Sequence, residues 1–296
     1  MPLFETEIQA RSGSARALRY ETAHGAFETP LFMPVGTHAT VKGITLTGLH
    51  ELNAQVVLAN TYHLYMRPGI DVIREAGGVQ SFMGYDGPML TDSGGFQLFS
   101  LAHMMKPGDD GVRFRADDYD GSKHFWTPEE NMRIQEAIGA DIVMQLDQCV
   151  GYPAEKRDVE TSTRLSWEWA ERCLTSHKRP DQALFGIVQG GMHLDLRLES
   201  VRRLLDAERE SAKRGGRRFD GFGIGGYSVG EDHEVMFQTL GDVAAALPED
   251  RPRYLMGVGN PTTLVRAVGA GVDMFDCVLP TRTGRMGTAF SHEGRL

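Results

Sequence analysis

Short apolar runs recur along the chain, and each one ends in polar or glycine-rich residues. Eight such runs can be counted, at 31–35, 55–59, 89–91, 142–146, 184–188, 222–224, 254–258 and 272–275. Segments that are apolar on both faces are typical of parallel strands covered by helices, because neither face of such a strand meets water. The pattern therefore predicts eight buried parallel strands.

Helical signals fill several of the gaps between these runs. Segment 127–139 opens with a Thr-Pro-Glu-Glu capping box and closes with a glycine. Segment 260–269 opens with Asn-Pro, and its apolar positions 264, 265 and 268 are expected to be buried. Longer helical patterns cover about 157–177 and 192–212. The acidic, turn-rich stretch 107–121 is expected to be a surface insertion with a small hairpin.

Strand and helix alternating eight times indicate an α/β fold, a (β/α)8 TIM barrel formed as one domain by residues 1–296. A doubly wound open sheet is the alternative. After the eighth run only about 20 residues follow, and glycines at 284 and 287 are expected to break any helix there. We therefore expect the barrel to be C-terminally incomplete, without its last helix.

Composition and charge narrow the class of protein. Hydrophobic residues make up 41% and charged residues 24%, which excludes a disordered chain. The net charge of −9 argues against a bulk polyanion binder, but the last 46 residues hold six Arg and three acids, net +3, which favours a phosphate-bearing partner at that end. No signal peptide or membrane span is recognised, so we expect a cytoplasmic protein without membrane contact.

Polar residues follow the predicted strands at their carboxyl ends, where barrel enzymes hold their active sites. Asp92, Asp147 and Asp276 end three different runs, and Gln189 ends a fourth. A single Asp in such a place is often only a helix N-cap. Three together, with glycine pairs beside them, indicate a pocket in which two carboxylates could act as nucleophile and acid/base in a retaining glycosyl transfer.

Other motifs have weaker functional interpretations. The Gly-x-Gly-x-x-Gly pattern at 221–226 lies within a predicted strand and not after it, so a dinucleotide site is disfavoured. Cys149 and Cys277 are expected to be buried small residues, and no Cys-x-x-Cys pair predicts a disulfide framework or a zinc ribbon. His63 is expected to be a hydrogen-bonded residue near the pocket, and the arginines at 214–218 a solvated loop.

Six ordered blocks carry a more specific signal: DSGGFQ (92–97), MQLDQC (144–149), GIVQGG (186–191), GIGGYSVGE (223–231), YLMGVGNP (254–261) and DMFDCVLPTRTGR (273–285). Together they resemble the signature of bacterial-type tRNA-guanine transglycosylases, and the likeness runs from about residue 4 to the end. That family is a (β/α)8 barrel that exchanges the wobble guanine of a tRNA anticodon for a 7-deazaguanine base, on the path to queuosine.

The resemblance implies a role for individual residues. Asp276 would be the nucleophile that forms a covalent ribosyl ester, and Asp92 the general acid/base. The implied base-binding residues are Ser93, Gly94, Gly95, Phe96, Asp147, Gln189, Gly226 and Met256, with Asp147 accepting from guanine N–H groups, Gln189 and Gly226 reading the carbonyl oxygen, and Phe96 and Met256 enclosing the flat ring. The implied tRNA-binding residues are Gly257, Val258, Gly259, Asn260, Thr281, Arg282, Thr283, Gly284 and Arg285.

The resemblance also implies features beyond Leu296. Family members continue with a zinc site of three cysteines and a histidine, which helps them bind tRNA and form a homodimer. Zinc is therefore expected from the family, but no ligand for it can be named in this chain, and dimerisation is in doubt. The alternatives are a nucleoside or sugar hydrolase on the same barrel, a non-catalytic accessory subunit, and an inactive fragment. The presence of Asp92, Asp147 and Asp276 together speaks against an accessory subunit.

Overall fold

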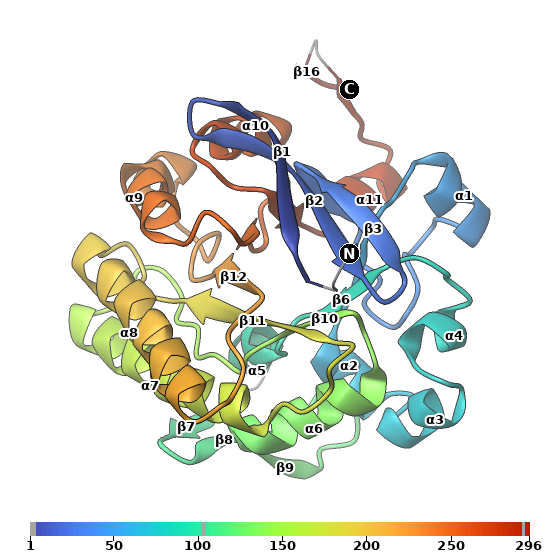
Figure 1. The fold of residues 1–296 in the computed structure, drawn as a ribbon. Helices are drawn as coiled ribbons and strands as arrows, with labels where there is room; N and C mark the ends of the chain where they lie inside the picture. Colours follow the sequence, from blue (N-terminus) through green and yellow to red (C-terminus); the bar gives the residue numbers. More distant parts are fainter. Residues whose placement is uncertain (1–3, 102–104, 292–293) are drawn as a thin grey trace.

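The computed structural model describes residues 4–101, 105–291 and 294–296, and its centre is an eight-stranded parallel sheet (Figure 1). Strand order around the sheet is β4-β14-β13-β12-β11-β10-β6-β5. The strands are β4 (Leu31–Met33), β5 (Val57–Ala59), β6 (Met89–Thr91), β10 (Ile142–Met144), β11 (Ala183–Val188), β12 (Gly221–Ile224), β13 (Arg253–Leu255) and β14 (Met274–Asp276). All eight predicted strands are therefore confirmed, with differences of a few residues at their ends.

Hydrogen bonds between the residues after β4 and those of β5 close the sheet into a barrel. The N–H of Leu58 donates to the carbonyl of Pro34 over 3.0 Å, and the N–H of Gly36 donates to the carbonyl of Leu58 over 2.6 Å. Because the first and last strands of the sheet are joined in this way, the fold is the predicted (β/α)8 barrel, and the open doubly wound sheet is excluded.

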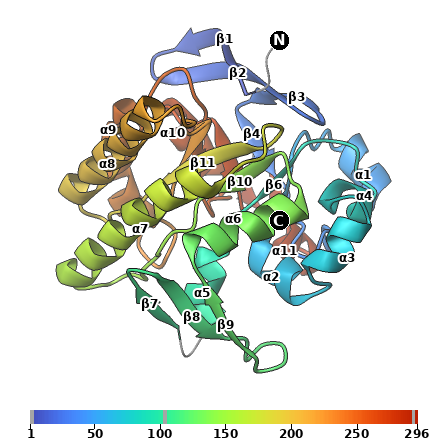
Figure 2. The same cartoon turned by 60° about the horizontal axis from the view of Figure 1, so that its bottom comes forward.

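Helices surround the barrel (Figures 1 and 2). They are α1 (Leu46–Glu51), α2 (Thr61–Met66), α3 (Ile70–Glu75), α4 (Val79–Met83), α5 (Gly95–Leu101), α6 (Pro128–Ile138), α7 (Lys156–Ser176), α8 (Leu194–Lys213), α9 (His233–Ala246), α10 (Pro261–Gly269) and α11 (Leu279–Arg285). The predicted caps of α6 and α10 are confirmed: Thr127 accepts from Glu130 N–H, and Asn260 accepts from the N–H groups of Thr262 and Thr263.

Two details of the helices differ from the sequence-based expectation. Val265 on α10 is 74% exposed, because Thr263 and Ala267, one turn apart, face the barrel instead. A seven-residue helix, α11, forms after the eighth strand where glycines were expected to prevent one. Pro280 lies in its first turn, where a missing N–H costs nothing, and the Thr283 hydroxyl donates to the carbonyl of Leu279 over 2.7 Å.

The N-terminal strands β1 (Thr6–Ser12), β2 (Ala15–Thr22) and β3 (Gly25–Thr29) form an antiparallel sheet, blue in Figure 1, that lies across one end of the barrel. Tyr20 and Phe27 from this sheet belong to the same buried cluster as Phe185 and Met144 of the barrel strands. The sheet therefore closes the barrel at the end where the parallel strands begin, and it leaves the carboxyl ends open. This sheet was not predicted.

The predicted insertion is a three-stranded antiparallel sheet of β7 (Lys106–Gly108), β8 (Gly111–Arg115) and β9 (Lys123–Trp126). Figure 2 shows it on the side of the molecule opposite to β1–β3. Val112, Phe114 and Trp126 are buried, so the insertion packs firmly on the body of the protein. The last two strands, β15 (Phe290–Ser291) and β16 (Gly294–Arg295), form a short antiparallel pair that projects from the body of the protein (Figure 1).

The glycine pattern at 221–226 is explained by packing inside the barrel. A Cβ at Gly221 would lie 2.3 Å from the Phe185 ring, and one at Gly223 would lie 2.7 Å from the terminal methyl of Met144. Large side chains from β11 and β10 fill the barrel because these two positions of β12 have none.

Candidate active site

The carboxyl ends of the barrel strands surround one cavity of about 370 Å³. Its walls come from the ends of all eight barrel strands, and they include Asp92, Asp147 and Asp276. The predicted site residues that line it are Asp92, Ser93, Gly94, Phe96, Asp147, Gln189, Gly226, Met256, Gly257 and Asp276. His63, Cys149 and Cys277 also line the cavity. Residues that are far apart in the sequence are thus brought to one place by the barrel topology.

Asp92 follows β6, and donors from the adjoining strand end hold its carboxylate. Oδ1 accepts the backbone N–H of Thr61 over 3.0 Å and that of Gly94 over 3.1 Å, while Oδ2 accepts the side-chain amide of Asn60. Asn60 also caps α2 through its other amide atom, which accepts the N–H of His63 over 3.0 Å. The helix cap therefore fixes the side chain that orients Asp92.

Asp276, the last residue of β14, is held through one of its two oxygens. Oδ1 accepts the hydroxyl of Tyr254 over 2.6 Å and the backbone N–H of Gly257 over 2.8 Å. Among the residues that the structure describes, none donates a hydrogen bond to Oδ2. The carboxylate is therefore fixed in orientation, with one oxygen left for a ligand.

Burial raises the pKa of both carboxyls. It raises the pKa of Asp92 to about 7; the hydrogen bond from Thr61 opposes this, and the nearby charge of Asp276 adds to it. Burial also raises the pKa of Asp276, against the hydrogen bonds from Tyr254 and Gly257. A carboxyl that titrates near neutral pH can both give and take a proton, as general acid–base chemistry requires.

Asp147, after β10, is buried and already has two donors. The Ser93 hydroxyl donates to Oδ1 over 2.7 Å, and the side-chain amide of Gln189 donates to Oδ2 over 2.7 Å. The N–H of Gly95 in turn donates to the Ser93 hydroxyl over 3.0 Å. The polar groups of the pocket therefore satisfy one another, and a ligand with its own donors would replace these partners.

The remaining predicted base-binding residues shape the pocket. A Cβ at Gly95 would lie 2.5 Å from Asp147 Oδ1, so only glycine leaves that carboxylate accessible. Phe96 on α5 is 48% exposed, and both it and Met256 line the cavity. Gly226 has a φ of +69°, which glycine adopts without strain.

The predicted tRNA-binding residues fall into two segments next to the cavity. In the first, Gly257 holds Asp276, Val258 is buried, a Cβ at Gly259 would meet Cys277, and Asn260 caps α10, so each has a structural task. The second segment, Thr281–Arg285, forms most of α11. Arg282 and Arg285 are exposed, and Arg285 donates to the carbonyl of Lys42 over 3.2 Å.

Three further residues at the site were missed by the sequence reasoning. They are Asn60, Tyr254 and Glu231, whose carboxylate accepts the backbone N–H groups of Ser228 and Val229. Asn60 directly follows the apolar run 55–59, which is the signal that could have pointed to it, whereas Tyr254 lies in an apolar run where a core role is the ordinary interpretation. His63 agrees with its prediction: it lines the cavity, and its Nδ1 lies 2.7 Å from the Tyr119 hydroxyl.

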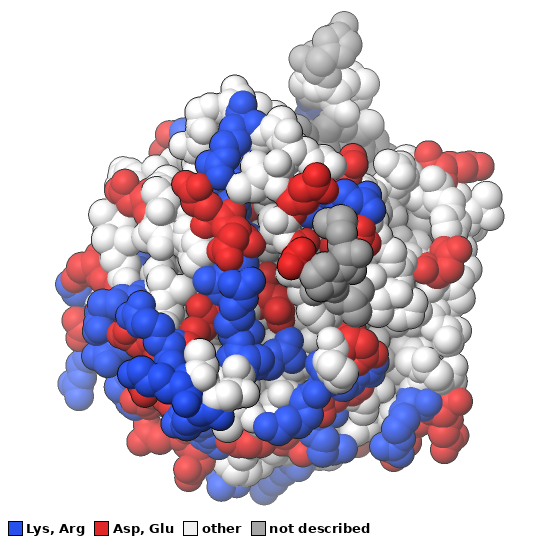
Figure 3. Space-filling view, in the orientation of Figure 1, with Lys and Arg blue, Asp and Glu red and all other residues white. Residues whose placement is uncertain are grey.

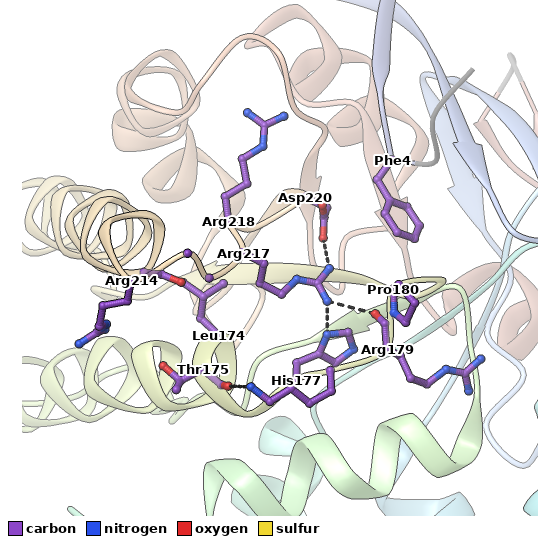
Figure 4. Close-up of a pocket in the computed structure, with 14 residues that line it drawn as sticks. Phe4, Leu174, Thr175, His177, Arg179, Pro180, Arg214, Arg217, Arg218 and Asp220 are labelled. Atoms are coloured by element: carbon purple, nitrogen blue, oxygen red, sulfur yellow. Dashed lines mark hydrogen bonds and ion pairs between the residues drawn. The ribbon is translucent and has the colours of Figure 1, made fainter.

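A second cavity, of about 820 Å³, lies at the other end of the barrel strands (Figure 4). Arg217 is at its centre and donates to Asp220 over 2.6 Å, to His177 and to two backbone carbonyls. Arg214 pairs with Glu171, and Arg218 with Asp250. The prediction of a solvated loop is confirmed for Arg214 and Arg218, whereas the side chain of Arg217 is largely buried. On the face in Figure 3, acidic residues likewise lie among the basic ones.

The described part of the chain holds neither a metal site nor a membrane-spanning helix. Within residues 4–101, 105–291 and 294–296, no group of three or more His, Cys, Asp and Glu side chains could hold a metal ion. The described residues therefore do not fit a zinc site. None of the helices in the same ranges is long and apolar enough to cross a membrane.

Fold and site together define an enzyme of the (β/α)8-barrel class with three carboxylates in one pocket at the carboxyl ends of its strands. The family model described as queuine tRNA-ribosyltransferase matches residues 11–296. The chain therefore belongs to the queuine tRNA-ribosyltransferase family.

Curated relatives from several bacteria agree with this. The chain is 51% identical to the queuine tRNA-ribosyltransferase of Desulforamulus reducens over 297 residues, which cover 100% of this chain and 77% of the relative. It is 52% identical to that of Moorella thermoacetica, with 97% of this chain and 74% of the relative covered. For the one of Deinococcus radiodurans the identity is 49%, over 99% and 72%.

Proposed function

We propose that this chain exchanges guanine at the wobble position of tRNA for a 7-deazaguanine base, by double displacement through a covalent ester of Asp276. One observation supports this most strongly. Asp276 is oriented through Oδ1 and leaves Oδ2 for a ligand, and it shares its cavity with a carboxyl whose pKa is about 7. A fixed nucleophile beside a proton donor and acceptor is the pair of groups that a retaining glycosyl transfer needs.

In the first step, Oδ2 of Asp276 attacks C1′ of the ribose. The bond between C1′ and N9 breaks, guanine leaves with the bonding electron pair, and protonated Asp92 supplies the proton. In the second step, ionised Asp92 removes the N9 proton of the incoming base. N9 then attacks C1′, the ester bond breaks, and its electron pair returns to Asp276. Each step uses a form of Asp92 that is populated near neutral pH.

The pocket offers groups that match a guanine-like ring. Ionised Asp147 only accepts hydrogen bonds, so it suits the N1–H and amino group of the base, whereas the Gln189 amide and the N–H of Gly226 suit its carbonyl oxygen. The hydrogen bond from Gln189 to Asp147 would be replaced when the base enters. Phe96 and Met256 provide an aromatic and a thioether face for the ring.

The exposed arginines of α11 support a tRNA substrate. Both arginines, Arg282 and Arg285, lie on α11, which begins three residues after Asp276. Val278, directly before this helix, lines the cavity. Guanidinium groups there would contact phosphates and base edges of the anticodon loop, while the target base is turned out of the stack into the pocket. We place this reaction in the cytoplasm, where tRNA is found.

Incorporation of labelled guanine into tRNA tests the proposal. Wild-type protein is expected to label a tRNA with guanine at the wobble position and to leave the same tRNA with adenine there unlabelled. A 7-deazaguanine should then displace the label. Release of free guanine without incorporation would instead indicate the hydrolase, and no reaction at all would contradict both activities.

A further inference from the structure

Arg197 occupies an electrostatically unfavourable position in the fold. It lies in the first turn of α8, where the helix dipole disfavours a positive charge, and it is completely buried. Burial lowers the pKa of its guanidinium to about 10. A cation held in such a place is costly, so its contacts must compensate for the cost.

These contacts join two strand ends of the pocket. Nε donates to the carbonyl of Gly191 over 2.6 Å, after β11, and Nη1 donates to the carbonyl of Gly225 over 2.9 Å, after β12. The guanidinium carbon lies 3.3 Å from the centre of the Tyr227 ring. Arg197 therefore fixes the segment that carries Gln189 relative to the segment that carries Gly226.

The side chain packs directly behind the groups proposed to read the base. A Cβ at Gly226 would lie 2.4 Å from Gln189 Oε1 and 3.6 Å from Arg197 Nη2. A Cβ at Gly190 would lie 2.6 Å from the backbone nitrogen of Arg197. Nη2 itself is buried and has no hydrogen-bond partner within the described residues. The Arg197 guanidinium therefore lies immediately behind the pocket wall, with one of its nitrogens lacking an acceptor in the described part of the chain.

The carbonyl of Gly225 and the N–H of Gly226 belong to the same peptide group. A charged donor on the carbonyl oxygen draws electron density from the peptide, which makes its N–H a stronger donor. We propose that Arg197 is a positioning residue that aligns and polarises the Gly225–Gly226 peptide, so that Gly226 N–H binds the carbonyl oxygen of the base more strongly. This inference rests on the proposed function.

The consequence is greatest when the base leaves. As the C1′–N9 bond breaks, negative charge develops on the departing guanine and reaches its carbonyl oxygen, where the polarised N–H stabilises it. Arg197 would therefore affect the preference for bases that carry a good acceptor at this position. An arginine that only supports the fold would affect stability and leave this preference unchanged.

The test compares guanine with 6-thioguanine, in which sulfur, a larger atom and a weaker acceptor, replaces the carbonyl oxygen. The ratio of the two kcat/KM values is measured for the wild type, Arg197→Met and Arg197→Lys. Arg202→Met, an exposed arginine on the same helix, is the matched control. Because both bases are assayed in one preparation, the ratio does not depend on the fraction of enzyme that is folded.

We expect Arg197→Met to reduce the preference for guanine by about threefold to tenfold, the effect of weakening one hydrogen bond to developing charge. Arg197→Lys keeps the charge but cannot reach both carbonyls, so we expect a smaller reduction in this variant. If Arg197→Met does not fold, Arg197→Lys alone provides the test. A wild-type ratio in every Arg197 variant that folds would overturn the inference while the proposed function stands. A wild type that does not exchange guanine would overturn both.

Discussion

Tyr254 donates its hydroxyl proton to Oδ1 of Asp276 over 2.6 Å, from the middle of β13 to the end of β14. This hydrogen bond and the one from Gly257 both end on the same oxygen, so they fix which oxygen faces the cavity. Burial raises the pKa of Tyr254 well above its usual range, so the phenol stays protonated and remains a donor at every physiological pH. The proposed nucleophile is therefore oriented by a residue that the sequence presents as an ordinary core tyrosine.

Tyr254→Phe removes this donor and leaves the ring in place. We expect kcat for guanine exchange to fall by about tenfold to a hundredfold, since a hydrogen bond to a charged group contributes roughly 1.5–3 kcal/mol. KM for guanine should change little, because the base-reading groups are untouched. Tyr20→Phe is the matched control: Tyr20, on β2, is also buried against the barrel strands, but its hydroxyl donates to the Asp220 carbonyl. An unchanged kcat in Tyr254→Phe would show that this hydrogen bond has no role.

The pKa of Asp92, about 7, predicts opposite pH dependences for the two half-reactions. Release of guanine needs protonated Asp92 and should slow as pH rises above 7. Capture of the incoming base needs the ionised form and should slow as pH falls below 7. Single-turnover rates between pH 5.5 and 8.5 measure both. Parallel pH profiles for the two steps would be inconsistent with a single residue serving as acid and base.

The same raised pKa predicts an effect on stability. Asp92 binds its proton more tightly in the folded than in the unfolded protein. The free energy of unfolding therefore decreases as pH rises from about 4, the usual pKa of Asp, to about 7, and this decrease is complete above pH 7. Asp92→Asn abolishes this titration. The difference in Tm between Asp92→Asn and the wild type should therefore be more favourable to the variant at pH 8 than at pH 4. The variant is expected to be inactive. A difference in Tm that does not vary with pH would contradict the raised pKa.

Asp147→Asn tests recognition of the base. The amide has nearly the same shape but presents a donor where the N1–H or amino group of guanine requires an acceptor. We expect kcat/KM for guanine to fall by about a hundredfold or more, because a charge-assisted hydrogen bond is lost and a misplaced donor is added. Asp109→Asn, an exposed aspartate, is the control. A normal value for Asp147→Asn would remove this residue from the base-reading set.

Much of the barrel was predictable because its strands are buried on both faces. Runs such as 142–144 and 184–188 have no polar side chain, and the cap at Thr127 begins its helix as predicted. The β1–β3 sheet was missed because β1 is almost wholly exposed and has no apolar pattern. The signal that could have revealed the sheet is the alternation in β2 of Leu18 and Tyr20, which face inward, with Arg19 and Glu21.

The residues of the site could be predicted from the sequence, but the hydrogen bonds between them could not. The position of Asp92, Asp147 and Asp276 at strand ends was enough to place them in one pocket. Sequence cannot show that Asp276 uses one oxygen for both of its donors or that Arg197 joins two loops, because these contacts depend on side chains from separate strands and helices. Val265 illustrates the same limit, since α10 buries Thr263 and Ala267 and leaves this apolar residue exposed to water.

The covalent ester on Asp276 is the central claim, and a denaturing gel of the protein with tRNA tests it most directly. Wild-type protein, incubated with a tRNA that has guanine at the wobble position and then freed of guanine, is expected to show a band of protein joined to tRNA. Addition of a 7-deazaguanine should remove that band. Asp92→Asn should form the adduct more slowly than wild type, because its amide cannot protonate the departing guanine, and should resolve it more slowly still, because it cannot remove the N9 proton of the incoming base.

Asp276→Asn is expected to show no adduct while it still binds tRNA with nearly wild-type affinity, because exposed arginines such as Arg282, and not Asp276, would contact the phosphates. Affinity is measured separately at one fixed salt concentration, so that a missing band cannot be attributed to lost binding. An adduct that persists in Asp276→Asn would contradict the account and place the nucleophile elsewhere, with Asp92 as the first residue to examine.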